Sequence, residues 1–349
     1  MTFRVALVGS GNISETHARA AAEARGVELV AVWGRNREAA AQLAHAHRVT
    51  RYDTLDDMLA LPGLDAVLIG TPSGAHAEPA VAASRRGVHV LVEKPLEITL
   101  ARSDEIIGAA ARAGTLVAVC FQERSAPDLV WLKALIDAER MGRLLLASAS
   151  VRWYREPAYY ASSAWRGTRA MDGGGALMNQ GIHTVDLLLW LCGPVVGVMA
   201  VAVTALHRIE VEDTVVATLE FASGAVGTLE VTTAAYPGLA RRVTLTGTAG
   251  TVVVDGDRIA DVRLREACDG PPAPGGSTSP SPIPSANPST SAQSPVVSDV
   301  SGHRRIIEDL AAAVRDGRRP CCDGADGRRS VAVVDAIYRA AATGLPVTL

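Results

Sequence analysis

The sequence has few aromatic residues, few cysteines and no large excess of either charge. Phe, Trp and Tyr make up 4% of its 349 residues, so a large aromatic-lined groove is not expected. A formal net charge of −3 excludes a strongly basic nucleic-acid binder or an acidic tail as the main feature. The five cysteines form no disulfide framework and show no C-x-x-C spacing, so we expect no structural zinc site. Free thiols are typical of a reducing compartment, which predicts a cytoplasmic protein.

Targeting and membrane-spanning segments are also missing from the pattern. The first apolar run, Val5–Val8, is too short for the core of a signal peptide. One uncharged stretch, from Leu187 to Leu206, is long enough to cross a bilayer. Gly193 and Pro194 interrupt it, with helical spacing before them and β-branched residues after them. The stretch therefore predicts a buried helix, a turn and a buried strand.

Strand-like and helix-like segments alternate along residues 1–122. This alternation predicts βαβ units and a doubly wound parallel sheet of the Rossmann type, the α/β part of the fold. The predicted strands are Arg4–Val8, Val27–Trp33, Leu64–Ile69, Val88–Val92 and Leu116–Phe121.

Residues 123–349 have a different pattern, with consecutive strands joined by turns. We expect a second, α+β domain with an open, mostly antiparallel sheet and two closing helices. Within it, Asp269–Ser298 consists mostly of Pro, Ser, Gly, Ala and Thr, which predicts a disordered loop. The predicted strands are Leu144–Trp153, Val195–Leu206, Asp213–Phe221, Ala225–Ala234, Arg241–Thr246 and Gly250–Val254; the closing helices are Arg304–Arg315 and Arg328–Ala342.

A glycine pattern follows the first predicted strand and precedes the first helix. Gly9 permits a tight turn, Gly11 permits close approach of a pyrophosphate, and Ser14 takes the place of a third glycine. Such turns are common in isolation, but the strand–turn–helix context predicts dinucleotide binding.

The end of the second strand bears on the choice of cofactor. An NAD site usually has an acidic residue there, but this strand is followed by Gly34, Arg35, Asn36 and Arg37. Two arginines can pair with a 2′-phosphate, which favours NADP(H) over NAD(H). The alternative is that they are solvated residues at the start of a helix.

Two further segments carry residues suited to proton transfer. Glu93-Lys94-Pro95 follows the strand Val88–Val92, where a partly desolvated lysine can act as a general acid or base, although the tripeptide alone is more often a surface turn. Far along the chain, a glycine-rich and flexible entry precedes Asn179, His183 and Asp186, which share one face of a predicted helix. A lone histidine on a helix more often has a structural role, but the polar neighbours of His183 favour a catalytic role here.

Taken together, these segments resemble the glucose–fructose oxidoreductase/inositol dehydrogenase/MocA (Gfo/Idh/MocA) family over nearly the whole chain. Each motif is modest alone, and their order and spacing carry the resemblance. The segments are Gly9–Ile13, Thr71–His76, Glu93–Pro95, Trp165–Gly167, Gly173–Asp186, Glu212–Thr214 and Asp323–Ser330.

The resemblance implies roles for individual residues. Lys94 would be the catalytic acid/base, with a cis bond to Pro95, and His183 would face substrate and nicotinamide. In many relatives an aspartate precedes this histidine by four residues; Asn179 stands there and cannot take up a proton, so inositol oxidation is less expected. The implied cofactor-binding residues are Gly9, Gly11, Asn12, Ile13, Arg35, Asn36, Thr71, Pro72, His76, Glu93 and Lys94. Candidates for substrate binding are Trp165, Arg166, Asn179, His183, Tyr154 and Tyr236.

The sequence therefore predicts an NAD(P)-dependent oxidoreductase that acts on a sugar, sugar derivative or cyclic polyol. The family's open sheet commonly packs against other subunits, so the resemblance implies a homodimer or homotetramer. Two alternatives stay open: glycoside cleavage through transient oxidation by a tightly held NAD, and a non-catalytic nucleotide sensor on the same fold. Substrate identity, stereochemistry and direction do not follow from fold analogy.

Overall fold

The computed structural model describes residues 2–266, 270 and 299–349, which form two compact units. The first unit holds the described residues within 1–125, 170–173 and 294–331. The second holds those within 126–169, 174–293 and 332–349. Apart from Gly270, the predicted disordered loop Asp269–Ser298 lies outside the described residues.

The first unit is built on a six-stranded sheet in the order β3-β2-β1-β4-β5-β6, with every pair parallel. This is the strand order of a dinucleotide-binding fold, and it confirms the predicted Rossmann architecture. The order reverses between β1 and β4, so the carboxyl ends of these strands border the ligand crevice of such a sheet. The strands are β1 (Phe3–Val8), β2 (Val27–Trp33), β3 (Thr50–Arg51), β4 (Ala66–Ile69), β5 (His89–Val92) and β6 (Val117–Val119).

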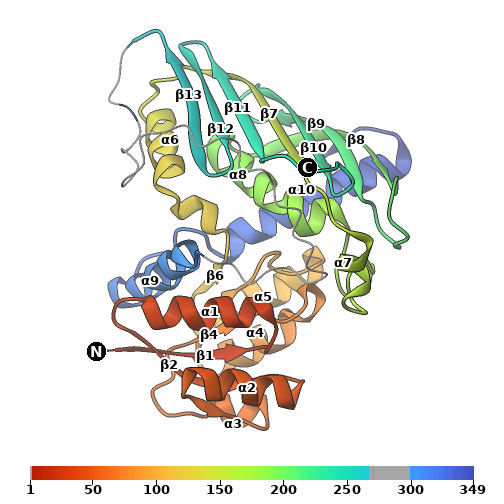
Figure 1. The fold of residues 1–349 in the computed structure, drawn as a ribbon. Helices are drawn as coiled ribbons and strands as arrows, with labels where there is room; N and C mark the ends of the chain where they lie inside the picture. The colour runs from red at the N-terminus through yellow and green to blue at the C-terminus, as the bar shows by residue number, and fades with distance from the viewer. Residues whose placement is uncertain (1, 267–269, 271–298) are drawn as a thin grey trace. The chain divides into compact units, whose positions relative to one another are not determined.

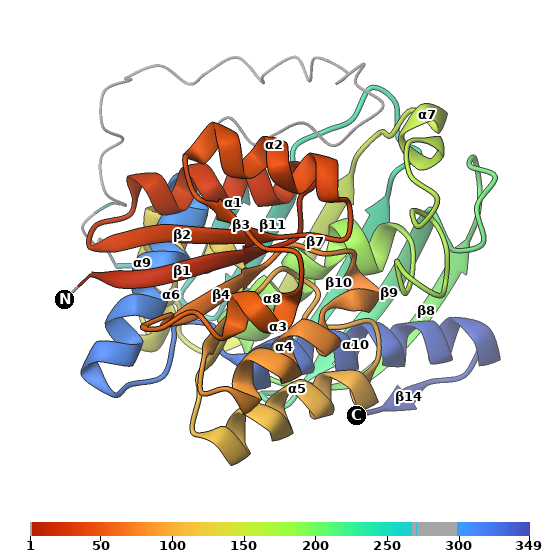
Figure 2. The same cartoon turned by 90° about the horizontal axis from the view of Figure 1, so that it is seen from below.

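Helices cover both faces of this sheet (Figures 1 and 2). In Figure 2, α1 (Asn12–Glu23) and α2 (Arg37–His47) lie on one face, and α4 (Ala77–Arg85) and α5 (Leu100–Ala113) lie on the other. Because the strands are covered on both sides, their sequences are continuous apolar runs. The short β3 and α3 (Leu55–Leu59) carry too few residues for a periodic signal and were not predicted.

One helix from the end of the chain belongs to the first unit. α9 (Ser301–Asp316) packs on α1, and its Ile306, Ile307 and Leu310 are buried in the core of the Rossmann sheet. The sequence pattern alone places all of residues 123–349 in the second domain. The difference has a physical reason: α9 is amphipathic, and its apolar stripe completes the cover of α1, which sequence order does not reveal.

The second unit is built on an eight-stranded sheet in the order β13-β12-β11-β7-β10-β9-β8-β14. Only β7 and β10 pair in parallel, which confirms the expected mostly antiparallel sheet. Buried and exposed residues alternate along β9, as in a sheet with one covered face. The strands are β7 (Leu144–Arg152), β8 (Val195–Val203), β9 (Thr214–Phe221), β10 (Val226–Thr232), β11 (Arg242–Gly247), β12 (Gly250–Asp255), β13 (Arg258–Leu264) and β14 (Val347–Thr348).

The helices of this part of the chain include the one that begins the uncharged stretch. α8 (Ile182–Cys192) ends at Gly193, whose φ of 88° is left-handed, and β8 follows, as predicted. The expectation of a buried strand is wrong: Val201 on β8 is 65% exposed, because one face of the sheet is not covered. Across the described residues, no helix combines the length and the apolar content that crossing a bilayer requires. The other helices are α6 (Pro127–Asp137), α7 (Pro157–Ala161) and α10 (Gly324–Thr343).

Candidate active site

The glycine turn between β1 and α1 has the geometry that a pyrophosphate needs. Gly9 has a φ of 122°, and a Cβ placed on it would lie 2.7 Å from the Gly70 carbonyl oxygen. Gly11 caps α1 without a side chain, and a Cβ on it would meet nothing within 4 Å. Its carbonyl accepts from the amide of Ser14 at 2.9 Å, while Ser14, in the place of a third glycine, is fully buried. The bare helix start with open space before it fits a dinucleotide phosphate.

Asn12 and Ile13 form the first turn of α1, where the remaining amides of the helix start lie. Ile13 is partly exposed, and its Cγ2 would lie 3.0 Å from a Cβ on Gly70. Gly70 is the residue after β4, so Ile13 lies against the end of one of the two strands that flank the reversal in strand order. This position is consistent with the predicted role of Ile13 beside a cofactor.

The polar residues after β2 are exposed, and each contacts a residue elsewhere in the first unit. Arg35 donates to Glu78 at 3.2 Å, and both side chains are about three-quarters exposed. Arg37 lies 3.6 Å from Asp53. Exposed pairs of this kind contribute little free energy, so they do not prevent an arginine from binding a phosphate instead. Asn36 serves as the N-cap of α2, accepting from the amide of Ala39 at 3.0 Å.

His76 joins two loops of the first unit. Its Nδ1 lies 2.9 Å from the Pro95 carbonyl oxygen, and its Nε2 lies 3.0 Å from that of Thr71. Thr71 also donates from its hydroxyl to Ala75 at 3.0 Å across the short 3₁₀ turn that Pro72 begins. Burial lowers the pKa of His76, against the effect of the two carbonyl acceptors. The imidazole thus connects the Thr71 loop to the turn that carries Lys94.

Lys94 follows β5, and its bond to Pro95 is cis, as the family resemblance implies. The side chain is half-buried. Burial lowers the pKa of Lys94, whereas the nearby Glu93, Asp172, Glu123 and Cys120 raise it. A lysine with a lowered pKa at a strand end can exchange a proton at a pH closer to neutral than an exposed lysine can.

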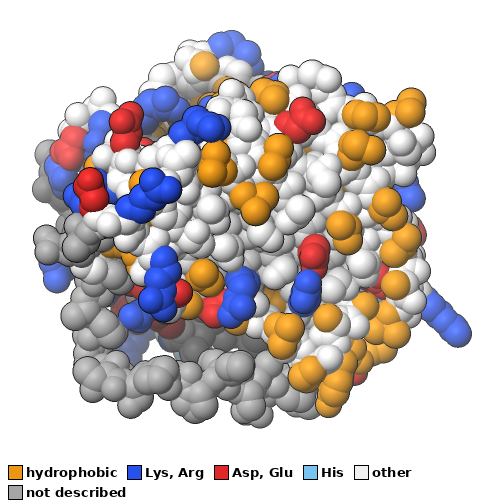
Figure 3. Space-filling model, turned by 90° about the horizontal axis from the view of Figure 1, so that it is seen from above, with side chains coloured by type: hydrophobic (Ala, Val, Ile, Leu, Met, Phe, Trp, Pro, Cys, Tyr) orange, Lys and Arg blue, Asp and Glu red, His pale blue; other side chains and the backbone are white. Residues whose placement is uncertain are grey.

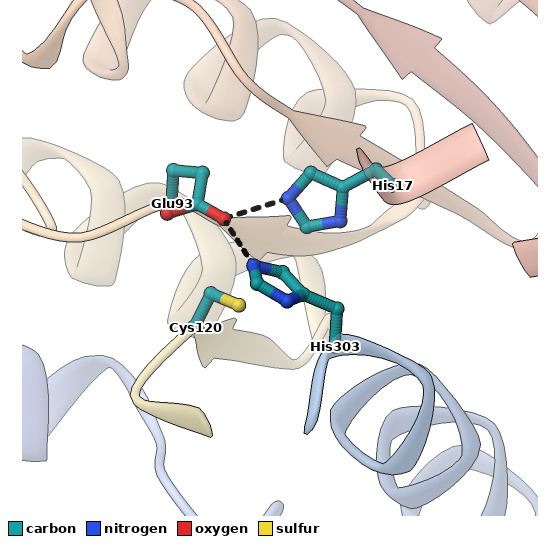
Figure 4. Close-up of side chains that lie close together, drawn as sticks. All are labelled: His17, Glu93, Cys120 and His303. Atoms are coloured by element: carbon teal, nitrogen blue, oxygen red, sulfur yellow. Dashed lines mark hydrogen bonds and ion pairs between the residues drawn. The ribbon is translucent and has the colours of Figure 1, made fainter. Parts of the chain in front are cut away.

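Three residues that sequence reasoning missed surround Glu93. His17 on α1, Cys120 after β6 and His303 on α9 come from distant segments, and their side chains converge on the Glu93 carboxylate (Figure 4). The four potential metal-ligand atoms all lie within 4.8 Å of one another, and all four residues are buried. Spacing along the chain carries no signal for this arrangement, because it depends on α9 joining the first unit.

In the second unit, Asn179 and His183 are not on one regular helix. Leu177–Gly181 forms a π-turn that carries Asn179, and α8, which carries His183, begins after it. A Cβ on Gly181 would lie 2.8 Å from Val231 on β10, so this glycine lets the wide turn approach the sheet. π-turns inside helices often occur at functional sites. The regular spacing predicted for Asn179, His183 and Asp186 therefore holds only from His183 onward.

The glycine-rich entry to this turn is tightly packed, whereas flexibility was expected. A Cβ on Gly174 would overlap the Tyr338 hydroxyl, and one on Gly175 would overlap the Glu212 carbonyl. The Glu212 carboxylate accepts from the amides of Gly175 at 3.0 Å and Leu177 at 2.9 Å, and from Tyr338 at 2.9 Å. The glycines are needed for close approach, and Glu212 holds the start of the turn in place.

Arg166 and Asn179 are connected through two residues that were not predicted. Arg166 donates to the Tyr159 hydroxyl at 2.6 Å, and Gln180 donates to the same hydroxyl at 3.3 Å. Gln180 also donates to the Asn179 amide oxygen at 3.2 Å. The Arg166 guanidinium stacks at 4.4 Å from the centre of the Tyr159 ring and at 4.9 Å from that of Trp165. Trp165, Arg166 and Asn179 therefore belong to one polar and aromatic network.

The remaining predicted substrate residues, Tyr154 and Tyr236, contact each other. Their rings meet edge to face with centres 5.2 Å apart, and Tyr236 is 73% exposed. Arg166 additionally borders a hollow of about 640 Å³ in the second unit, together with Tyr160, His207 and Glu210. A volume of this order suits a small molecule.

Comparison with known proteins identifies both parts of the chain. Residues 3–121 match the oxidoreductase family with an NAD-binding Rossmann fold, and residues 129–253 match the GFO/IDH/MocA C-terminal domain. The WlbA dehydrogenase from Bordetella pertussis, solved in complex with NADH and UDP-GlcNAcA, is 34% identical with a TM-score of 0.86. The similarity covers 100% of this chain and 99% of that one.

Two curated relatives extend the range of named activities. A 1,5-anhydro-D-fructose reductase from Ensifer adhaerens is 28% identical over 98% of this chain and 97% of its own length. Inositol 2-dehydrogenase 4 from Saccharopolyspora erythraea is 30% identical over 78% of this chain and 79% of its own. These relatives are a reductase and a dehydrogenase whose names refer to a sugar derivative and a cyclic polyol.

Proposed function

The chain belongs to the Gfo/Idh/MocA family of NAD-binding oxidoreductases, and from this membership we propose that it oxidises or reduces a sugar, sugar derivative or cyclic polyol. A bound nicotinamide dinucleotide supplies the hydride acceptor or donor for a CH–OH carbon. Lys94 removes the hydroxyl proton during oxidation and returns it to the carbonyl oxygen during reduction.

The observation that carries this proposal is the environment of Lys94. The residue follows a strand of a nucleotide-binding sheet, at the edge where such sheets bind their ligands. Burial lowers its pKa, so that a fraction of the amine is unprotonated closer to neutral pH than for an exposed lysine. Three acidic neighbours, Glu93, Asp172 and Glu123, oppose this effect and keep the proton available for the reverse reaction.

We propose NADP(H) as the preferred cofactor. No acidic residue directly follows β2, whereas Arg35 and Arg37 do, and Gly34 leaves room beside them. Gly9, Gly11, Asn12 and Ile13 would contact the pyrophosphate, and the Thr71–His76 loop and Glu93 would lie along the nicotinamide half. The solved relative holds NADH, so a direct comparison of the two cofactors tests the preference.

In the second unit, we propose His183 and Asn179 as contacts of the substrate hydroxyl groups. Asn179 cannot take up a proton, so it orients a hydroxyl and leaves proton transfer to Lys94, with His183 as a hydrogen-bond partner. The network of Trp165, Arg166 and Tyr159 supports a polar substrate, because it combines a cation with aromatic faces.

The experiment that tests this function has two steps. A thermal-shift comparison of NAD⁺, NADP⁺, NADH and NADPH identifies the bound cofactor, because a ligand that binds the folded state raises the Tm. The preferred cofactor is then assayed at 340 nm with a panel of sugars, uronates and cyclic polyols. We expect a larger shift with NADPH and turnover of at least one panel member. Cofactor binding with cleavage of nitrophenyl glycosides and no net redox change would contradict a dehydrogenase, and binding without any turnover would indicate a sensor.

We also propose that copies of the chain associate through the open sheet of the second unit. Its outer face exposes large apolar side chains, and hydrophobic residues lie among polar ones over the surface seen in Figure 3. These side chains are Leu146, Met199, Val201, Val203, Val216 and Val226. A patch of this kind is unusual on a monomer.

The four described cysteines are free thiols, which supports the proposal of a reducing, cytoplasmic compartment.

A further inference from the structure

The buried Glu93 carboxylate collects hydrogen bonds from residues far apart in the sequence. His17 Nε2 lies 2.8 Å and His303 Nε2 lies 3.5 Å from the same oxygen, Oε1, and the two rings meet edge to face at 5.3 Å (Figure 4). The Cys120 thiol donates to the same carboxylate. The second oxygen, Oε2, accepts from the backbone amide of Lys94 at 3.2 Å. Both oxygens are therefore occupied by donors.

This arrangement determines the charge of Glu93. Burial alone would raise the pKa of Glu93, but the hydrogen bonds from His17 and His303 hold it well below its ordinary value. Because an ionised carboxylate only accepts hydrogen bonds, Nε2 of each ring carries the hydrogen. Burial lowers the pKa of His17 and raises that of Cys120, so His17 and the thiol donate as neutral groups. The cluster thus holds an ionised carboxylate in a buried position.

That charge lies directly beside the proposed acid/base. The charged and titratable groups that face Lys94 are Glu93, Asp172, Glu123 and Cys120, and Glu93 has the largest effect of the four on the pKa of the lysine. Glu93 also holds the lysine's own backbone amide through Oε2. If Glu93 lost its charge, it would no longer stabilise protonated Lys94, and its hydrogen bond to the Lys94 backbone amide would weaken.

We propose that His17 and His303 are positioning residues for the reaction: their hydrogen bonds keep Glu93 ionised and oriented, and Glu93 in turn holds the Lys94 backbone and favours the protonated lysine. This proposal rests on the proposed acid/base role of Lys94. It gives α9, from the end of the chain, a part in setting the chemistry of a Rossmann strand end.

The chain itself makes the test direct, because it contains only two lysines, Lys94 and Lys133. Labelling with ¹³Cε-lysine gives one NMR signal for each, and a pH titration yields the pKa of Lys94 with Lys133 as the internal reference. Replacing His17 or His303 by Leu removes a donor, so the pKa of Glu93 rises and less negative charge faces the lysine. We expect the pKa of Lys94 to fall by about one unit in H17L and H303L.

Conservative and control variants separate this effect from loss of packing. H17Q and H303Q keep an N–H donor at a similar distance and should retain a pKa of Lys94 close to that of the wild type. E93Q removes the charge without changing size and should reproduce the decrease even if H17L fails to fold. H47L removes another histidine–carboxylate pair of the first unit, His47 with Glu15 at 3.0 Å, and should leave Lys94 unchanged.

Two results would overturn the proposal. The first is an unchanged pKa of Lys94 in folded H17L, H303L and E93Q. The second is about one zinc ion per chain in the purified wild type, measured by mass spectrometry and lost in C120S, because the two Nε2 atoms would then ligate a metal. The proposed function has a separate test. Turnover of K94M at the wild-type rate would exclude the acid/base role of Lys94, whatever the titrations show. An inactive K94M, together with an unchanged pKa of Lys94 in H17L, H303L and E93Q, would refute only the positioning role.

Discussion

The two units of this protein position their candidate functional residues in different ways. In the first unit, Gly9 and Lys94 each follow a strand of a regular parallel sheet, and the strand ends determine where they lie. In the second unit, Asn179 lies on a π-turn and Arg166 on an irregular segment after α7. Regular sheet topology can be predicted from an alternating pattern, whereas irregular segments depend on packing that the pattern does not contain.

This difference explains which predictions succeeded. The Rossmann sheet, the mostly antiparallel sheet and the break at Gly193 followed from periodicity and turn residues. The π-turn did not, because Gly181 is required there by contact with Val231, a residue on another strand. The glycines at 174 and 175 also looked flexible in sequence but are packed against Tyr338 and Glu212.

The Glu93 cluster could not be predicted for a related reason. His17 lies within the predicted nucleotide-binding helix and His303 lies more than two hundred residues away, so no spacing rule connects them. Assigning α9 to the first unit would have placed His303 near the sheet, and the amphipathic pattern of α9 was the available signal. From the difference between the two units, we expect substitutions in the first unit to affect catalysis and cofactor binding. Substitutions in the second unit should affect substrate affinity.

The largest expected effect is on turnover in K94M. Loss of the acid/base should lower kcat by a factor on the order of 10² or more, because general acid–base catalysis contributes about that much. Lys94 is also among the implied cofactor-binding residues, but cofactor affinity, measured by fluorescence titration, should fall much less than kcat. K133M is the matched control, because Lys133 pairs with Asp137 on α6 and should retain full activity. A K94M variant as active as K133M would contradict the assignment.

Substitution of the nucleotide turn should have the next largest effect. G9A places a Cβ against the Gly70 carbonyl in a left-handed conformation, so both the Tm and cofactor affinity should fall, the latter by roughly tenfold or more. G11A has open space around its Cβ, so its Tm should stay unchanged. Its cofactor affinity should still fall, because the phosphate of the cofactor would occupy that space. Equal Tm values for the two variants would show that Gly9 is not under the steric constraint described.

A smaller effect is expected at the end of β2. R35S should reduce the ratio of kcat/KM for NADPH to that for NADH by about tenfold, because it removes a cation available to a 2′-phosphate. R85S, on the exposed end of α4, serves as the control for loss of one surface charge. An unchanged ratio in R35S would mean that the arginine is only a solvated helix-start residue.

The smallest effect should come from the second unit. Y159F removes the hydroxyl that accepts from Arg166 and Gln180, so KM for the substrate should rise by about three- to tenfold, while kcat changes less. Y52F changes a tyrosine of the first unit instead and should leave KM for the substrate unchanged. A fall in kcat with constant KM in Y159F would contradict the proposed division between chemistry and recognition.

Above all, we propose that the first unit tunes Lys94 as the proton-transferring group. It is tested most directly by titrating ¹³Cε-labelled Lys94 in the wild-type protein and comparing its pKa with the pH dependence of oxidation. Because the base acts unprotonated, kcat/KM should rise with pH and reach half its maximum at the pKa of Lys94, below that of an exposed lysine. A pKa of Lys94 equal to that of an exposed lysine, or a pH profile unrelated to it, would contradict the account.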